Sequence, residues 1–193
     1  MSDNSKSTGS FIQTWTGKKF DFMNPESDSI VIEDIAHALS LTCRFGGHTL
    51  RFYSVADHSV NVARLLAWEG HSIPTIQAGL LHDSAESFLG DVVTPLKKML
   101  PAISDMEKNI SSVMLQRFCV DTSDVDFDAI KLSDQIMLVA EAETILDNPP
   151  INNWTERYPK VPKYLRLHIS QTPKEAEYYF LAAAKLLLDV EIS

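Results

Sequence analysis

A histidine and an aspartate stand side by side at His82-Asp83, inside the otherwise apolar segment 79–86. Both residue types are uncommon inside a protein core unless a partner compensates their polarity. His58 and Asp134 stand in similarly apolar surroundings elsewhere in the chain. Two imidazoles and two carboxylates form a mixed nitrogen and oxygen set that suits Mn²⁺, Fe²⁺, Co²⁺ or Zn²⁺. The pattern favours a metal-dependent hydrolase in which these four side chains bind one ion.

Helical spacing indicates that these polar side chains point inward. His58 lies three residues after Val55 and four before Val62, and Asp134 lies four residues after Ile130. Residues three and four apart share one face of a helix. Burying an isolated carboxylate costs several kcal/mol, whereas a paired or metal-bound one is tolerated. We therefore expect these side chains to meet at an ion.

Glu86 follows His82 by four residues and Asp83 by three, so a continuous helix would place it on the same face. A carboxylate beside a metal-bound water can orient that water or take its proton. The alternatives are a plain core pair for His82-Asp83 and a solvated helix position for Glu86. The Glu-Ala-Glu stretch 141–143 is most simply a helix face, although its first residue lies on the same side as Asp134.

The elements that must position these residues are mostly helices. Apolar periodicity and helix-end signals predict helices over about 33–43, 54–68, 74–89, 103–118, 129–147 and 173–189. Gly46-Gly47 is expected to end the first, and Asp128 to cap the fifth. Asn148-Pro149-Pro150 is a firm break, and strand signals are confined to short segments such as 19–22. We expect an all-α, compact single domain over residues 11–193, preceded by a disordered polar tail, residues 1–10.

Composition narrows the class of protein. The 193 residues suit one domain with a sizeable core. The two cysteines cannot form a disulfide framework, which favours the cytoplasm. No apolar stretch approaches the ~20 residues that a membrane span needs. A net charge of −9 disfavours binding to nucleic-acid polymers, so a phosphorylated small molecule would need local attraction from a metal and a few basic side chains.

The order His58…His82-Asp83…Asp134 resembles the H…HD…D signature of the HD-domain phosphohydrolase superfamily. The similarity is greater to the small bacterial 5′-deoxynucleotidases of HD type and to the phage HD-domain dATP triphosphohydrolases. It covers roughly residues 15–145. Besides the ligands it includes the segments 32–40, 43–48, 53–58 and 90–97.

The resemblance implies an HD-domain helical fold and a phosphohydrolase that cleaves the 5′ phosphoester of deoxynucleotides by attack of a metal-activated water. The expected reaction is dATP to deoxyadenosine and triphosphate, with dADP and dAMP as further substrates. Two alternatives stay open: a broad 5′-deoxynucleotidase acting on dNMPs, and a non-catalytic nucleotide-binding sensor. The expected cofactor is a divalent Co, Mn, Zn, Fe or Mg ion, with a second ion beside the substrate phosphates left open. Relatives form dimers or larger rings, so we expect a homo-oligomer, in the host cytoplasm if the gene is a phage's.

The resemblance also implies roles for residues outside the metal set. It assigns catalytic help to Glu86 and Arg44, and phosphate contact to Arg44 and Lys97. Asp91 would stand near the sugar or a second ion, and Pro95 would lie against the base. Phe45 stands where relatives often carry a tryptophan that crowds the 2′ side of the sugar, so exclusion of ribonucleotides is an open question.

Overall fold

The computed structural model describes residues 9–148 and 155–192, and it is all-α as expected. The helices are α1 (Ile32–Leu41), α2 (Val55–Trp68), α3 (Ile73–Leu81), α4 (Glu86–Leu89), α5 (Thr94–Lys97), α6 (Pro101–Arg117), α7 (Phe127–Ile145) and α8 (Pro173–Leu188). Short 3₁₀ turns lie between these elements, among them η1 (Ser27–Ser29), η2 (Arg44–Gly47) and η3 (Thr122–Asp124). Except for its last two residues, the expected tail 1–10 lies outside the described part, as do the prolines of the break at 148–150.

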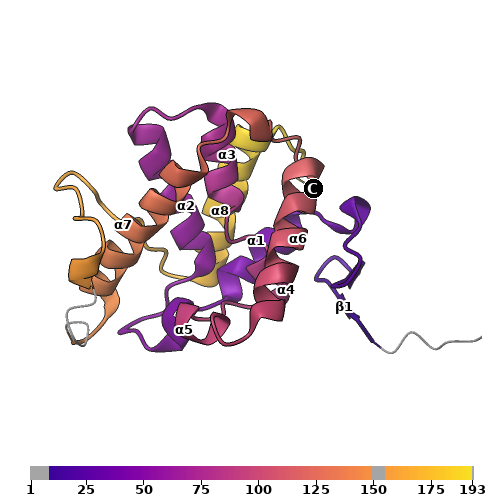
Figure 1. The fold of residues 1–193 in the computed structure, drawn as a ribbon, viewed down its shortest axis with the longest axis horizontal. Helices are drawn as coiled ribbons and strands as arrows, with labels where there is room; N and C mark the ends of the chain where they lie inside the picture. The colour runs from indigo at the N-terminus through magenta and orange to yellow at the C-terminus, as the bar shows by residue number, and fades with distance from the viewer. Residues whose placement is uncertain (1–8, 149–154, 193) are drawn as a thin grey trace, which may run out of the picture.

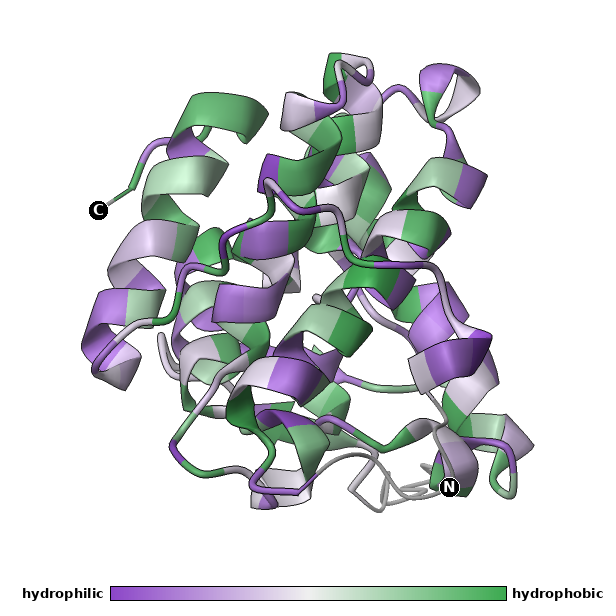
Figure 2. Cartoon of the chain, turned by 90° about the vertical axis from the view of Figure 1, so that its left-hand side faces the viewer, coloured by the Kyte–Doolittle hydropathy of each residue, from purple (hydrophilic) through white to green (hydrophobic). Residues whose placement is uncertain are grey.

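Helix α2 is the centre of the fold (Figure 1). It packs against α1, α3, α7 and α8, and every residue from Val55 to Ala63 is buried. The Ser54 side chain caps it by accepting a hydrogen bond from the Asp57 backbone N–H. The surrounding helices alternate hydrophobic and hydrophilic segments along their length, which is typical of packing on one face (Figure 2). A polar residue in the stretch 55–63 of α2 is therefore inside the protein whichever way it points.

A short hairpin at the margin of the helical body accounts for the predicted strand signal (Figure 1). Strands β1 (Phe11–Gln13) and β2 (Lys19–Asp21) pair antiparallel, with Ile12 opposite Phe20. Phe20 is fully buried and stacks on Phe88 of α4. Within the described residues, no helix is both long and apolar enough to cross a membrane.

The expected continuous helix from 74 to 89 is wrong. Helix α3 ends at Leu81, and α4 begins only at Glu86. The intervening turns use short-range bonds, with the Ser84 N–H on the Leu81 carbonyl and the Glu86 N–H on the Asp83 carbonyl. The Gly79 carbonyl, which the amide of residue 83 would use in an α-helix, accepts a hydrogen bond from the His82 ring. The helix is thus interrupted at His82-Asp83, the predicted metal-ligand pair.

Two helix ends also differ from expectation. Asp126, not Asp128, caps α7, because the Asp126 carboxylate accepts from the Ala129 N–H at 2.9 Å and the helix starts earlier. Helix α1 ends at Leu41 rather than at the two glycines, because Cys43 leaves the helix to form a bridge with Ser54. Gly46 and Gly47 lie instead in η2.

Candidate metal centre

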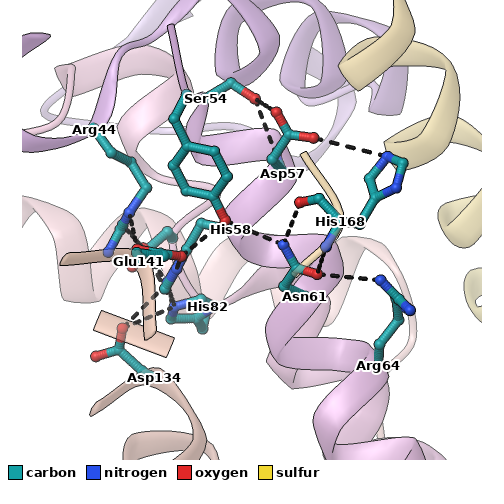
Figure 3. A network of polar contacts seen from close by, with 12 residues as sticks. Arg44, Ser54, Asp57, His58, Asn61, Arg64, His82, Asp134, Glu141 and His168 are labelled. Atoms are coloured by element: carbon teal, nitrogen blue, oxygen red, sulfur yellow. Dashed lines mark hydrogen bonds and ion pairs between the residues drawn. The ribbon is translucent and has the colours of Figure 1, made fainter. Parts of the chain in front are cut away.

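Three of the predicted ligands converge from separate parts of the fold (Figure 3). His58 lies on α2, His82 follows the end of α3, and Asp134 lies on α7. The His58 Nε2 is 3.2 Å from the His82 Nε2 and 3.1 Å from the Asp134 Oδ1. One ligand atom from each residue lies within 4.8 Å of the other two. The structure thus brings together three of the four predicted ligands, whereas their binding of an ion stays a prediction.

The second nitrogen of each imidazole is committed to an acceptor. The His58 Nδ1 lies 2.6 Å from the Glu141 Oε1, and the His82 Nδ1 lies 2.8 Å from the Gly79 carbonyl. Because a carboxylate and a carbonyl only accept, both Nδ1 atoms carry the proton in the neutral rings. In the neutral rings the two Nε2 lone pairs then face each other, an arrangement that repels unless a cation lies between them or one Nε2 takes up a proton. Nitrogen ligands at about 2.0–2.1 Å from one Zn²⁺ lie about 3 Å apart, as these atoms do.

Asp83 borders this group rather than completing it. Its Oδ2 lies 3.2 Å from the His82 Nε2 and 3.6 Å from the His58 Nε2, and 3.5 Å from the Arg44 Nη1. The Asp83 carboxylate is thus shared between the candidate metal position and a guanidinium. The His58 side chain is 0% exposed, whereas those of Asp83 and Asp134 are 23% and 39% exposed. The cluster is closed at His58 and open at the two aspartates, so a ligand would reach it from that side.

Excess negative charge around the cluster raises the proton affinity of two groups. Burial and Arg44 lower the pKa of His58, but the Glu141 and Asp134 carboxylates outweigh them and raise it to about 10. Burial raises the pKa of Glu86 to about 9, with further increases from Asp83 and a neighbouring aspartate. Without an ion, protons supply the positive charge that the site needs.

Glu86 is the least satisfied carboxylate of the cluster. It is buried, and its Oε2 has no hydrogen-bond partner among the described residues. Its Oε1 lies 3.7 Å from the Lys97 Nζ, which also lies 2.7 Å from the Glu107 Oε1. A buried oxygen without a partner is costly, so this one has capacity for a water or a ligand.

Arg44 is held inside by the turn that carries it. In η2, Phe45 and Gly46 both adopt left-handed backbone angles, with φ of 55° and 59°. Such a conformation costs a non-glycine residue about 1–3 kcal/mol. It leaves the Arg44 guanidinium buried, with its Nε 3.0 Å from the Glu141 Oε2, and the half-buried Phe45 ring 5.8 Å from its Cζ. The strained backbone of Phe45 thus lies directly beside Arg44, the candidate phosphate-binding residue.

The other predicted substrate contacts lie farther out. Asp91 is influenced by the charges of the cluster. Burial and the Asp83 carboxylate raise the pKa of Asp91 above its ordinary value, and Arg44 and Lys97 offset only part of this rise. Pro95 lies in the exposed first turn of α5. Its predicted contact with a base stays a prediction.

The sequence interpretation missed Glu141. The stretch 141–143 was expected to be simply a helix face, and Glu141 is instead buried at the candidate centre, whereas Glu143 is exposed. Helix α7 packs on α2, so residues two turns apart at 134 and 141 both face His58. Glu141 is 0% exposed and also accepts a hydrogen bond from the Tyr53 hydroxyl at 2.9 Å. The spacing of seven residues from Asp134 was the available signal.

Polar side chains of α2 extend the network to the segment before α8 (Figure 3). Asn61 donates to the His168 carbonyl at 2.8 Å and accepts from the His168 N–H at 2.9 Å. Asp57 accepts from the Ser170 hydroxyl at 2.6 Å. The buried polar residues of α2 therefore divide between the candidate metal centre and the anchoring of this segment.

Comparison with known proteins gives relatives but no activity. No protein-family model matches the chain. The chain is 39% identical over 132 residues to "Uncharacterized protein YfdR" of Escherichia coli (strain K12), a match covering 68% of this chain and 70% of that protein. It is 34% identical over 138 residues to "Uncharacterized protein RCAP_rcc00048" of Rhodobacter capsulatus, covering 67% and 70% of the two chains.

Proposed function

The chain belongs to the same family as the Escherichia coli protein YfdR, and we propose that it is a metal-dependent phosphohydrolase acting on the 5′ phosphoester of deoxynucleotides. One observation carries the proposal: the Nε2 atoms of His58 and His82 face each other and Asp134, while both Nδ1 atoms are bonded to acceptors. The resemblance to HD-domain phosphohydrolases supports the choice of reaction. The substrate proposed first is dATP, with deoxyadenosine and triphosphate as products.

The residues of the candidate centre would have separate roles in hydrolysis. His58, His82, Asp83 and Asp134 would hold a divalent cation, which would supply a Lewis acid that lowers the pKa of a water and polarises a phosphoryl oxygen. Glu86, buried and with its Oε2 lacking a hydrogen-bond partner among the described residues, orients the attacking water and accepts its proton. Water adds to phosphorus, the bond to the 5′ oxygen breaks, and that oxygen leaves as the nucleoside hydroxyl with the proton that Glu86 took from the water.

The charge that develops on phosphorus needs fixed cations. Arg44 reaches Asp83 with its Nη1 and is preorganised by the η2 turn, so it stabilises the phosphoryl oxygens without reorganising. Lys97 on α5 contributes a second positive charge. Its Nζ lies 2.7 Å from the Glu107 Oε1, and this ion pair holds it in place. Phe45 at the sugar, Asp91 at the sugar or a second ion, and Pro95 at the base complete the proposed substrate contacts.

A substrate panel tests the reaction. Purified protein with Mn²⁺, Co²⁺, Zn²⁺ or Mg²⁺ is given dNMPs, dNTPs and NTPs, and the products are separated by ion-exchange chromatography. We expect dATP to yield triphosphate and deoxyadenosine. Phosphate release from dNMPs alone would replace this reaction with the broad 5′-deoxynucleotidase. Binding of a nucleotide without turnover would favour the sensor.

A matched pair of variants ties any turnover to the centre. Asp134→Asn removes a ligand charge at constant size, and we expect it to lose both bound metal and product formation. Asp128→Asn makes the same change at an exposed position near the start of α7, and should keep both. Full activity in Asp134→Asn would contradict the proposed role of the centre.

A further inference from the structure

Glu141 connects the two halves of the proposed site. Its side chain is 0% exposed on α7, and both of its oxygens are used (Figure 3). The Oε1 accepts from the His58 Nδ1 at 2.6 Å and from the Tyr53 hydroxyl at 2.9 Å. The Oε2 accepts from the Arg44 Nε at 3.0 Å. One carboxylate thus contacts a candidate metal ligand and the candidate phosphate-binding residue.

This arrangement is poorly explained by stability alone. A buried ion pair loses solvation that its mutual attraction only partly returns, and a well-packed apolar replacement is often as stable. Yet the pair here also orients two groups. The bond to His58 fixes which ring nitrogen is free, and the bond to Arg44 leaves the Nη1 directed at Asp83.

We propose that Glu141 is a positioning residue that aligns the metal ligand His58 and the phosphate-binding Arg44 together. The inference rests on the proposed function: its Arg44 half needs the nucleotide substrate, and its His58 half needs only the proposed metal ion. The His58 half concerns metal affinity and stands without a nucleotide. Because one rigid carboxylate serves both, the distance between the metal position and the guanidinium is set by a single side chain.

Glu141→Gln separates these contacts at nearly constant volume. An amide has one acceptor and one donor end, so it can accept from His58 or from Arg44, but not from both. Tyr53→Phe is the matched control, because it removes the third hydrogen bond to the same carboxylate and leaves the other two. The readouts are Mn²⁺ affinity by calorimetry without nucleotide, and KM and kcat for dATP at saturating Mn²⁺.

We expect Glu141→Gln to fold and to lose about 10–100-fold in Mn²⁺ affinity or in kcat/KM at saturating Mn²⁺, as loss of a residue supporting a metal ligand typically does. Tyr53→Phe should stay within about threefold of wild type on both, because the bonds from His58 and Arg44 to Glu141, which orient these two side chains, remain. If the Gln variant does not fold, Glu141→Asp takes its place, since it keeps the charge but is too short to reach both partners.

Three outcomes would overturn the inference. Glu141→Gln could keep both quantities, Tyr53→Phe could lose as much as Glu141→Gln, or neither variant at position 141 could fold while Tyr53→Phe does. The last would assign Glu141 a structural role. Wild-type protein that binds Mn²⁺ but hydrolyses no nucleotide would contradict the proposed function while leaving the His58 half of this inference testable.

Discussion

At the scale of single residues, the candidate metal centre is defined by which side-chain atoms already have hydrogen-bond partners within the protein. The Nδ1 atoms of His58 and His82 are bonded inside the protein, and their Nε2 atoms are left 3.2 Å apart. Glu86 is the corresponding acid: it is buried, and its Oε2 has no hydrogen-bond partner among the described residues. Each arrangement is unfavourable with neutral imidazoles or an ionised carboxylate, and each is relieved by protonation in the metal-free protein or by a bound cation and water.

The Glu86 carboxylate makes the metal-free protein sensitive to pH. Its pKa is raised to about 9 from an ordinary 4.5, so the folded state holds a proton that the unfolded state releases between these values. Stability must therefore fall as pH rises through this window. In metal-free protein, Glu86→Gln should raise Tm by at least about 2 °C near pH 8, the shift that about 1 kcal/mol gives in a domain of this size.

The difference should shrink toward about pH 5, where Glu86 is protonated in the folded wild type and the two proteins are alike. Glu143→Gln, an exposed change on α7, is the control and should show no such pH dependence. Thermal unfolding followed by circular dichroism measures both. A Tm difference independent of pH would argue against a protonated Glu86.

At the scale of elements, the interruption between α3 and α4 sets the direction of the ligands. On a continuous helix, His82 and Asp83 would be separated by about 100°. The turns at 82–85 instead bring the Asp83 Oδ2 to 3.2 Å from the His82 Nε2. Periodicity could not predict this break, because the apolar spacing is the same on both sides and the cause is a ring-to-carbonyl bond.

Helix α7 carries Asp134 and Glu141, so its N-terminus matters to the centre. Asp126 caps it through the Ala129 N–H, whereas Asp128 lies in the exposed first turn. Asp126→Ala should cost about 1 kcal/mol, the usual worth of such a cap. Asp128→Ala removes only a charge near the helix dipole, worth about 0.3–1 kcal/mol. Urea unfolding of both variants measures the difference, and a larger loss in Asp128→Ala would contradict the capping assignment.

Most helices and the approach of His58, His82 and Asp134 to one another could be predicted from the sequence, but the interior contacts could not. Helices α2, α6 and α8 were accessible because each has an apolar stripe bounded by clear end signals. The role of Glu141 was missed, although it shares a helix face with Asp134, because that spacing does not show which residues of other helices lie opposite. Tyr53 bonds to Glu141, 88 residues later in the chain, and one sequence gives no measure of such distances.

At the scale of the whole molecule, side chains are most buried on α2 and more exposed away from it. The candidate metal centre extends from the buried interior toward the surface. His58 is enclosed, while Asp134 is the most exposed of the ligand set. The net charge of −9 repels polyanions, so attraction for a nucleotide must come from the bound cation, Arg44 and Lys97. The homo-oligomer suggested by the family resemblance stays a prediction, which sedimentation velocity with and without Mn²⁺ tests against the 21.6 kDa chain mass.

Metal binding should stabilise the entire domain. A ligand at 100 times its Kd adds about 2.7 kcal/mol to the folded state. For a chain of this size that corresponds to a Tm higher by roughly 5–10 °C. Mn²⁺ should give this shift in wild type and not in His58→Ala. Potassium chloride at matched ionic strength controls for screening of the acidic surface, and an equal shift with that salt would remove the case for a specific site.

The central claim is that the His58, His82 and Asp134 cluster makes this protein a metal-dependent deoxynucleotide hydrolase. The most direct test is dATP hydrolysis by one sample measured with Mn²⁺, after chelation, and after Mn²⁺ is restored, with His82→Ala measured in parallel. The account predicts triphosphate release that chelation abolishes and Mn²⁺ restores, and none from His82→Ala. Undiminished hydrolysis after chelation or in His82→Ala, or no hydrolysis of any deoxynucleotide by Mn²⁺-loaded wild type, would contradict it.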